Sequence, residues 1–138
     1  MKVIRSANRK TNRGAATTFT GVVFSDEVVA GTAPSRMRAS VVSFTPGART
    51  AWHSHPVGQT LFCLSGAGRV QREGEQVQEI RAGDTVIIPP NVRHWHGAAP
   101  DKLFSHLAMS EQNDKGEGTA WFEHVSEEAY NAAPAPVT

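Results

Sequence analysis

Residues 47–66 read GARTAWHSHPVGQTLFCLSG, and residues 83–100 read GDTVIIPPNVRHWHGAAP. In an extended strand, residues i and i+2 point to the same face. His53 and His55 therefore project together, and so do His94 and His96. Two such pairs on separate strands indicate imidazoles that converge inside a closed β-structure, where His106 of a later strand can join them.

A cluster of buried neutral imidazoles is costly without a partner, because each ring keeps a lone pair that needs a donor or a metal ion. A bound divalent metal removes that cost. The alternative is that these histidines lie on the surface or pack in the core without binding a metal. The presence of two His-x-His pairs on different strands favours the metal centre over this alternative.

The strand-like segments of the chain are short and are separated by glycine and proline turns. We expect strands at residues 39–44, 50–53, 60–64, 68–72, 76–80, 85–88 and 103–109. Turn signals at this regular spacing are typical of an all-β sandwich or barrel. A helical turn is expected only near the end, where Ser126 would cap residues 127–130.

Length and charge limit the possible organisation and partners. The 138 residues suit one domain, residues 1–138, with a barrel core at about 19–125 and a flexible tail at 131–138. A net charge of +1 gives no sign of a nucleic-acid or membrane partner. The first ten residues are basic but have no apolar stretch behind them, and Cys63 is the single cysteine. We therefore expect a cytoplasmic protein without disulfides.

The two glycine-led stretches resemble the two motifs of the cupins. They read Gly47-x5-His53-x-His55-x3-Gln59-x6-Gly66 and Gly83-x5-Pro89-x-Asn91-x2-His94. The resemblance implies a cupin (double-stranded β-helix or jelly-roll) barrel that holds one divalent metal ion. Carried over by position, the ligands are His53, His55 and His94, with Gln59 where the family usually has glutamate. Asn91 replaces a family glycine, and Asn tolerates the left-handed turn that this position needs.

Glutamine at the fourth ligand position changes the charge of the expected site. Three imidazoles and one amide are neutral, so the metal keeps its full positive charge and acts as a strong Lewis acid that favours anions. The alternative is that Gln59 does not bind and the site has three histidine ligands. Manganese, iron, cobalt, nickel and zinc all accept these ligand types.

A narrower resemblance covers about residues 19–130. The segments 47–53, 58–61, 71–74, 94–100, 106–108 and 123–125 resemble the small bacterial cupin hydroxynitrile lyases. Those enzymes use manganese to cleave or form cyanohydrins, so the resemblance implies manganese as the metal, with iron, cobalt, nickel or zinc as alternatives. They are dimers or tetramers, so we expect a homodimer or homotetramer with a small-molecule substrate. His106 is the candidate base, because the resemblance points to this position and because His106 does not belong to the expected ligand set. His96 is the candidate for a second catalytic histidine, which would position cyanide. Either could instead be a packed core histidine.

The expected substrate pocket is small and mostly apolar. Its candidate residues, which could equally be barrel packing, are Ser40, Val42, Phe44, Thr50, Leu61 and Cys63. Trp52 and Trp95 point to the opposite face, where a second sheet or a partner subunit would cover them.

These features predict a metal-dependent carbon–carbon lyase that acts on cyanohydrins such as mandelonitrile. One alternative is a cupin dioxygenase or another metalloenzyme on a small organic substrate, because cupin histidine sites also host oxygen chemistry. A non-catalytic cupin that binds a small molecule is the other alternative.

Overall fold

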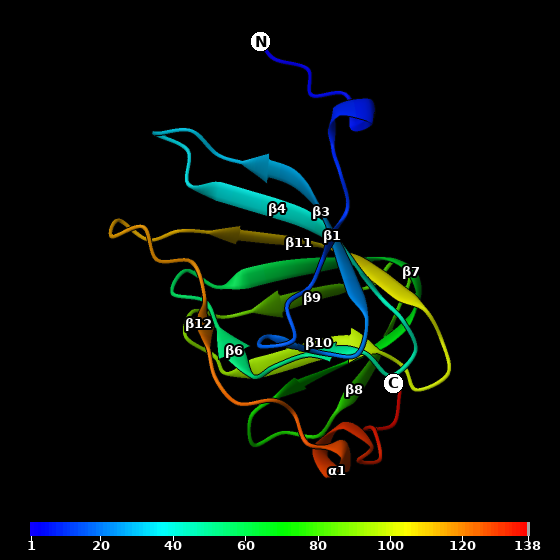
Figure 1. Cartoon of the computed structure of the whole chain (residues 1–138). Helices are drawn as coiled ribbons and strands as arrows, with labels where there is room; N and C mark the ends of the chain where they lie inside the picture. Colours follow the sequence, from blue (N-terminus) through cyan, green and yellow to red (C-terminus); the bar gives the residue numbers. More distant parts are fainter. Residues whose placement is uncertain (138) are drawn as a thin grey trace.

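A computed structural model describes residues 1–137 of the chain as a curled antiparallel sheet with one short C-terminal helix (Figure 1). Its elements are η1 (Ser6–Asn8), β1 (Asn12–Arg13), β2 (Phe19–Thr20), β3 (Val23–Ala30), β4 (Met37–Phe44), β5 (Arg49–Thr50), β6 (His53–Ser54), β7 (Gln59–Arg72), β8 (Gln78–Arg81), β9 (Thr85–Ile88), β10 (His94–Ala98), β11 (Phe104–Glu111), β12 (Ala120–Trp121) and α1 (Glu127–Tyr130).

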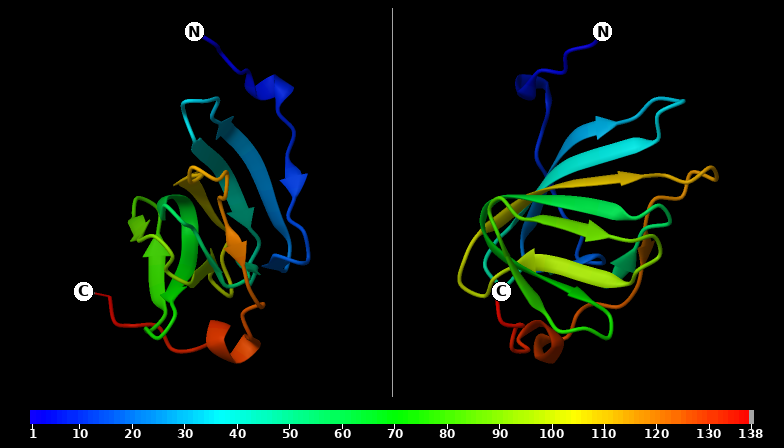
Figure 2. Two further views of the ribbon diagram at one scale, coloured as in Figure 1. Left: turned by 90° about the vertical axis from the view of Figure 1, so that its left-hand side faces the viewer. Right: turned by 180° about the vertical axis from the view of Figure 1, so that it is seen from behind.

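The strands follow the order β1-β3-β4-β11-β7-β10-β5-β2, and β6 joins β10 to β12. The long strand β7 links the two halves of the curled sheet, because its first part pairs with β11 and β9 and its second part with β10 and β8. Gly66 lies where β7 passes from one half to the other. Its φ is 77°, and a Cβ there would overlap the carbonyl oxygen of Leu103. A side chain would therefore collide with the backbone at this position, so glycine suits the passage of β7 between the two halves of the sheet. Figure 2 shows the curl of the sheet from two further sides.

The all-β barrel and the C-terminal helical turn expected from the sequence are confirmed. The segments 60–64 and 68–72 are one strand, because the glycines between them bend the backbone without ending the pairing. The segment 50–53 is divided between β5 and β6, and the strands β1, β2, β3 and β12 were not predicted. Asn91 adopts the expected left-handed conformation, with φ of 61°.

Two apolar clusters fill the interior. The larger one includes Phe44, Cys63 and Phe104, and the smaller one packs Trp95 against Val77, Val125 and Tyr130. The expectation that a second sheet or a partner subunit covers Trp95 is therefore wrong. The chain's own C-terminal segment covers this side chain, which is completely buried.

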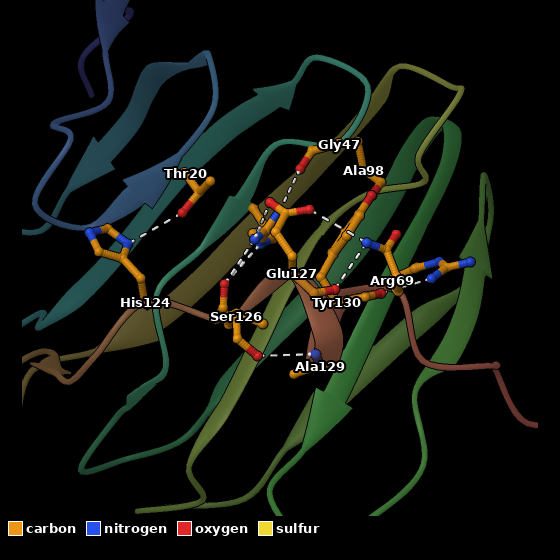
Figure 3. A network of polar contacts seen from close by, with 12 residues as sticks. Thr20, Gly47, Arg69, Ala98, His124, Ser126, Glu127, Ala129 and Tyr130 are labelled. Carbon is orange, nitrogen blue, oxygen red and sulfur yellow. Dashed lines mark hydrogen bonds and ion pairs between the residues drawn. The ribbon is translucent and has the colours of Figure 1, made fainter.

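The C-terminal segment is fastened to the barrel by polar contacts (Figure 3). Arg49 donates to the Val125 carbonyl oxygen at 2.8 Å and pairs with Glu127 at 3.1 Å. The Tyr130 hydroxyl donates to the Ala98 carbonyl oxygen at 2.5 Å. Ser126 caps α1 as predicted, since its hydroxyl accepts the Ala129 N–H at 3.1 Å.

The two ends of the chain lie on opposite sides of the barrel, with the N-terminal segment extending away from it (Figure 1). The flexibility of residues 131–138 stays a prediction. Within this tail Ala135 donates its N–H to the Val77 carbonyl oxygen at 2.7 Å, and Thr138 lies outside the described residues. Among residues 1–137, no helix is long and apolar enough to cross a membrane.

Candidate metal centre

Three histidines of the barrel interior are held by the same kind of hydrogen bond. Each donates its Nδ1–H to a backbone carbonyl oxygen: His53 to Ala51 at 2.9 Å, His55 to Gly118 at 2.9 Å and His94 to Val92 at 2.8 Å. A carbonyl oxygen can only accept, so Nδ1 carries the proton in each ring and Nε2 carries the lone pair. In metal sites, a hydrogen bond from one ring nitrogen to a carbonyl oxygen orients a histidine whose other nitrogen binds the metal.

Three of the four ligand atoms expected from the sequence have no protein partner. His55 Nε2, Gln59 Oε1 and His94 Nε2 are buried, and no described residue hydrogen-bonds to them. Buried polar atoms are rarely left in this state, because each loses its water without compensation. Three of the four ligands expected from the sequence therefore each present a free lone pair in the interior, and this donor set fits a divalent metal ion.

The strand pairing brings these side chains together. His53 of β6 and His94 of β10 are Cα partners across an antiparallel pair, with ring centroids 4.2 Å apart. His55 follows β6, and its ring centroid is 5.1 Å from that of His53. Gln59 is the first residue of β7 and, together with His53 and His55, lines an internal cavity.

The group of described histidines whose ligand atoms lie close enough together for a metal site overlaps this expected set without being identical to it. His53, His94 and His96 are buried, and one ligand atom from each lies within 4.8 Å of the others. This group could hold a metal ion. It shares His53 and His94 with the set expected from the sequence, but it contains His96 in place of His55 and Gln59.

His96 and His106 form a hydrogen-bonded pair beside this group. His106 Nε2 lies 2.9 Å from His96 Nδ1 across the interior between β10 and β11. Both rings are buried, and the remaining nitrogens, His96 Nε2 and His106 Nδ1, have no partner among the described residues. Phe44 packs against both rings, with centroid distances of 6.0 and 5.3 Å.

Burial keeps all five of these imidazoles neutral near pH 7. Loss of water is the largest cause for each, and it lowers the pKa of His94 and of His106 to about 4. The pKa values of His53 and His96 fall well below 6.5, because neighbouring imidazoles add to the effect of burial. The pKa of His55 is lowered as well. The histidines are thus in the form that can bind a metal or accept a proton.

A cavity of about 200 Å³ is lined by four of these histidines, His53, His55, His96 and His106, but not by His94. Four of the expected pocket residues line it: Ser40, Val42, Phe44 and Thr50. The other two, Leu61 and Cys63, do not line this cavity. Both are at most 1% exposed, and Cys63 belongs to the larger apolar cluster, where burial raises the pKa of its thiol to about 11.

Several lining residues were not predicted from the sequence. They are Phe19, Ser25, Arg38, Ala39, Ala108, Ser110, Thr119 and Trp121. Trp121 of β12 is the Cα partner of His53, and the centroids of their rings lie 4.7 Å apart. No strand was expected around Trp121, so its approach to the metal histidines had no local signal. Alternation along the strand could have identified Arg38, which lies two residues before Ser40.

A buried histidine cluster inside a curled antiparallel barrel defines a class of metal-binding β-barrel proteins. A family model described as a cupin domain matches residues 40–108. The chain therefore belongs to the cupin family. It is also 45% identical over 130 residues to an (R)-mandelonitrile lyase from Granulicella tundricola, an alignment that covers 94% of this chain and 98% of the relative.

Solved structures share the fold. A cupin-like protein from Thermotoga maritima has a TM-score of 0.80 and 39% identity, covering 86% of this chain and 89% of its own. A polyketide cyclase from Streptomyces resistomycificus has a TM-score of 0.69 over 94% of this chain and 90% of its own. At 15% identity, the second match shows the fold alone.

Proposed function

We propose that this cupin is a metal-dependent hydroxynitrile lyase, which cleaves and forms cyanohydrins such as mandelonitrile. The observation that carries the proposal is the buried pair of His106 and His96 next to the histidine cluster, both open to one small cavity. The relative at 45% identity, a mandelonitrile lyase, supports it. The cavity wall supplies Val42 and Phe44 for an aromatic ring.

His53, His55, Gln59 and His94 are the proposed ligands of one divalent metal, with manganese as the proposed ion. The free lone pairs of His55 and Gln59 support this set, since both atoms would stay unsatisfied if His96 took their place. Such a metal would act as a Lewis acid on a hydroxyl or carbonyl oxygen. It would keep its full positive charge, because all four ligands are neutral.

Cleavage requires that the substrate hydroxyl lose its proton while the carbon–cyanide bond breaks. His106 Nδ1 accepts this proton, because it is buried, has no protein partner and belongs to a ring that is neutral near pH 7. The electron pair of the breaking bond leaves with cyanide, and the carbonyl double bond forms. The His106 imidazolium then returns the proton to cyanide, which gives HCN, the aldehyde and the neutral histidine.

His96 holds His106 in the tautomer that this step needs. With its Nδ1 accepting from His106 Nε2–H, the neutral His96 carries its own proton on Nε2. That N–H is free to donate to cyanide as charge develops on it. The pair therefore provides one proton acceptor and one anion donor within a single buried unit.

Metal analysis and a mandelonitrile assay on the same preparation, purified without chelator, test the proposal. We expect about one divalent metal per chain and benzaldehyde formation that chelation abolishes. Iron-loaded protein that consumes oxygen with diketones, thiols or phenols, and leaves mandelonitrile intact, would instead identify an oxygenase. Full metal occupancy without turnover of either class would identify a binding protein.

The assembly and location belong to the same proposal. We propose a homodimer or homotetramer in the cytoplasm, on the basis of the resemblance and of the single buried cysteine. Light scattering of the purified protein measures the number of subunits directly.

A further inference from the structure

An arginine lies on the inner face of the strand that forms one wall of the cavity. Side chains alternate along β4, so Arg38 shares the face of Ser40, Val42 and Phe44, and all four line the cavity. In the register with β11, Val42 is the Cα partner of His106, whereas Arg38 is the partner of Ser110. Arg38 therefore stands four residues, or about 13 Å of strand, from the level of His106.

The charge of this arginine has no counterpart in the structure. Within residues 1–137 its guanidinium makes no hydrogen bond and no ion pair. Arg38 is the one lysine or arginine among the residues that line the cavity, and none of them is aspartate or glutamate. Glu27, the acidic residue paired in register with Ser40, does not line the cavity. The Arg38 side chain is exposed, so the cavity carries an unpaired positive charge where it meets solvent.

The surroundings of Arg38 suit an anion. Ser40 and Ser110 provide hydroxyl groups on the two neighbouring strands, and both line the same cavity. A guanidinium binds a carboxylate through two parallel N–H···O bonds, which fixes the orientation of a planar acid. In the register, Ser40 and Ala108 lie between this polar end and the level of His106, whereas Val42 lies at that level and Phe44 beyond it. The cavity therefore has polar groups at both ends.

We propose that Arg38 binds a carboxylate of the substrate, so that the preferred substrates are aromatic hydroxynitriles or aldehydes with an acid group opposite the reacting carbon. This assignment rests on the proposed function. A two-carbon substrate held at His106 is too short to reach an arginine placed four residues along the strand.

Binding of two unreactive probes tests the assignment without turnover. 4-Carboxybenzyl alcohol and benzyl alcohol differ only in the acid group, and calorimetry on the manganese-loaded protein measures the affinity of each. We expect Arg38→Gln to weaken the carboxylated probe about 10- to 100-fold and to leave benzyl alcohol unchanged. Arg38→Lys should keep part of the affinity, and Arg36→Gln, which removes a nearby arginine outside the cavity, should keep all of it.

The same comparison in metal-free protein separates Arg38 from the metal as the acceptor of the carboxylate. If Arg38→Gln lowers the affinity for the carboxylated probe in metal-free protein as well, the assignment is supported. If the preference for the carboxylated probe over benzyl alcohol is lost when the metal is removed, the assignment is overturned. Equal losses for both probes, or none, also overturn it. Assays with mandelonitrile and its 4-carboxy derivative then treat the two proposals independently. If both nitriles are cleaved and Arg38→Gln has no effect, this inference is wrong and the proposed lyase activity stands. If neither nitrile is cleaved but binding of the carboxylated probe depends on Arg38, the proposed lyase activity is wrong.

Discussion

His106 Nε2 lies 2.9 Å from His96 Nδ1, and a single proton occupies the space between these two neutral rings. If His106 holds that proton, its Nδ1 is free to act as a base, and His96 carries its other proton on Nε2. If His96 holds it, His96 Nε2 is free to bind a metal, and His106 Nδ1 is protonated. The hydrogen bond thus makes the two roles mutually exclusive, so that a His106 base requires a metal site without His96.

Substitution of each contested ligand decides between the two metal groups. We expect His55→Ala to lower manganese affinity by at least about tenfold, as His53→Ala and His94→Ala should, because each removes a ligand. His96→Ala should retain one metal per chain. Metal content after dialysis against graded chelator measures this order, with His124→Ala as the control for an exposed histidine. Loss of metal from His96→Ala but not from His55→Ala would establish the group that contains His96.

Removal of the proposed base should separate catalysis from metal binding. His106→Ala is expected to keep stoichiometric metal and to lose mandelonitrile cleavage by about 10²- to 10⁴-fold, since it deletes the proton acceptor. His106→Phe restores the bulk that Phe44 and Phe104 pack against, and it should be as inactive as the alanine variant. Initial rates of benzaldehyde release, measured with metal analysis of the same sample, provide the test. Unchanged rates in both variants would refute the base.

The sequence predicted those parts of the site that depend on local spacing. The alternation of His53 and His55, and the turn at Asn91 that precedes His94, are properties of single segments, and the cupin motifs contain both. The hydrogen bond between His96 and His106 depends on how β10 and β11 face each other across the interior, which no local pattern records.

The missed elements have physical reasons of their own. β3 contains Asp26 and Glu27, which interrupt the apolar pattern of a strand, and β12 is only two residues long. Leu61 and Cys63 share the alternation of β7 with Gln59, so no local pattern separates them from the cavity. In the fold both are buried, and Cys63 belongs to the larger apolar cluster.

The neutrality of Gln59 is open to a direct test. Gln59→Glu keeps an oxygen ligand of almost the same size but places a negative charge at the metal. We expect retained manganese, at least about tenfold slower mandelonitrile cleavage, and weaker binding of azide as an anionic probe, because the added carboxylate offsets the charge of the metal. Azide titration of the loaded protein measures this. Equal azide affinity in both proteins would show that Gln59 does not set the charge of the site.

The polar contacts between the C-terminal segment and the barrel should contribute to stability without affecting cleavage of mandelonitrile. Tyr130→Phe removes the hydroxyl that donates to the Ala98 carbonyl oxygen and leaves the ring packed on Trp95. We expect a loss of about 1–2 kcal/mol in the free energy of unfolding, because the carbonyl oxygen stays buried. Ser126→Ala, which deletes the α1 cap, should cost about 1 kcal/mol. Urea unfolding measures both, and kcat/KM for mandelonitrile should match that of the unmodified protein. A matching loss of activity would mean that the segment acts on the site.

Acidification should unfold the metal-free protein through its buried histidines. In the unfolded chain these side chains titrate near pH 6.5, whereas burial lowers the pKa of His94 and of His106 to about 4 in the fold. Between these values the unfolded chain binds more protons than the folded one, so stability is full above about pH 6.5 and declines as the pH falls toward 4.

We therefore expect the Tm of chelated protein to drop by more than about 10 °C between pH 7 and pH 5. His106→Phe, which cannot take up a proton, should show a smaller drop than the unmodified protein. Bound manganese should hold the Tm nearly constant until the pH at which protons displace it, because the ligands must stay deprotonated. Scanning calorimetry across this range measures all three samples. A Tm of the metal-free protein that is independent of pH between 7 and 5 would show that the histidines are not held neutral by burial.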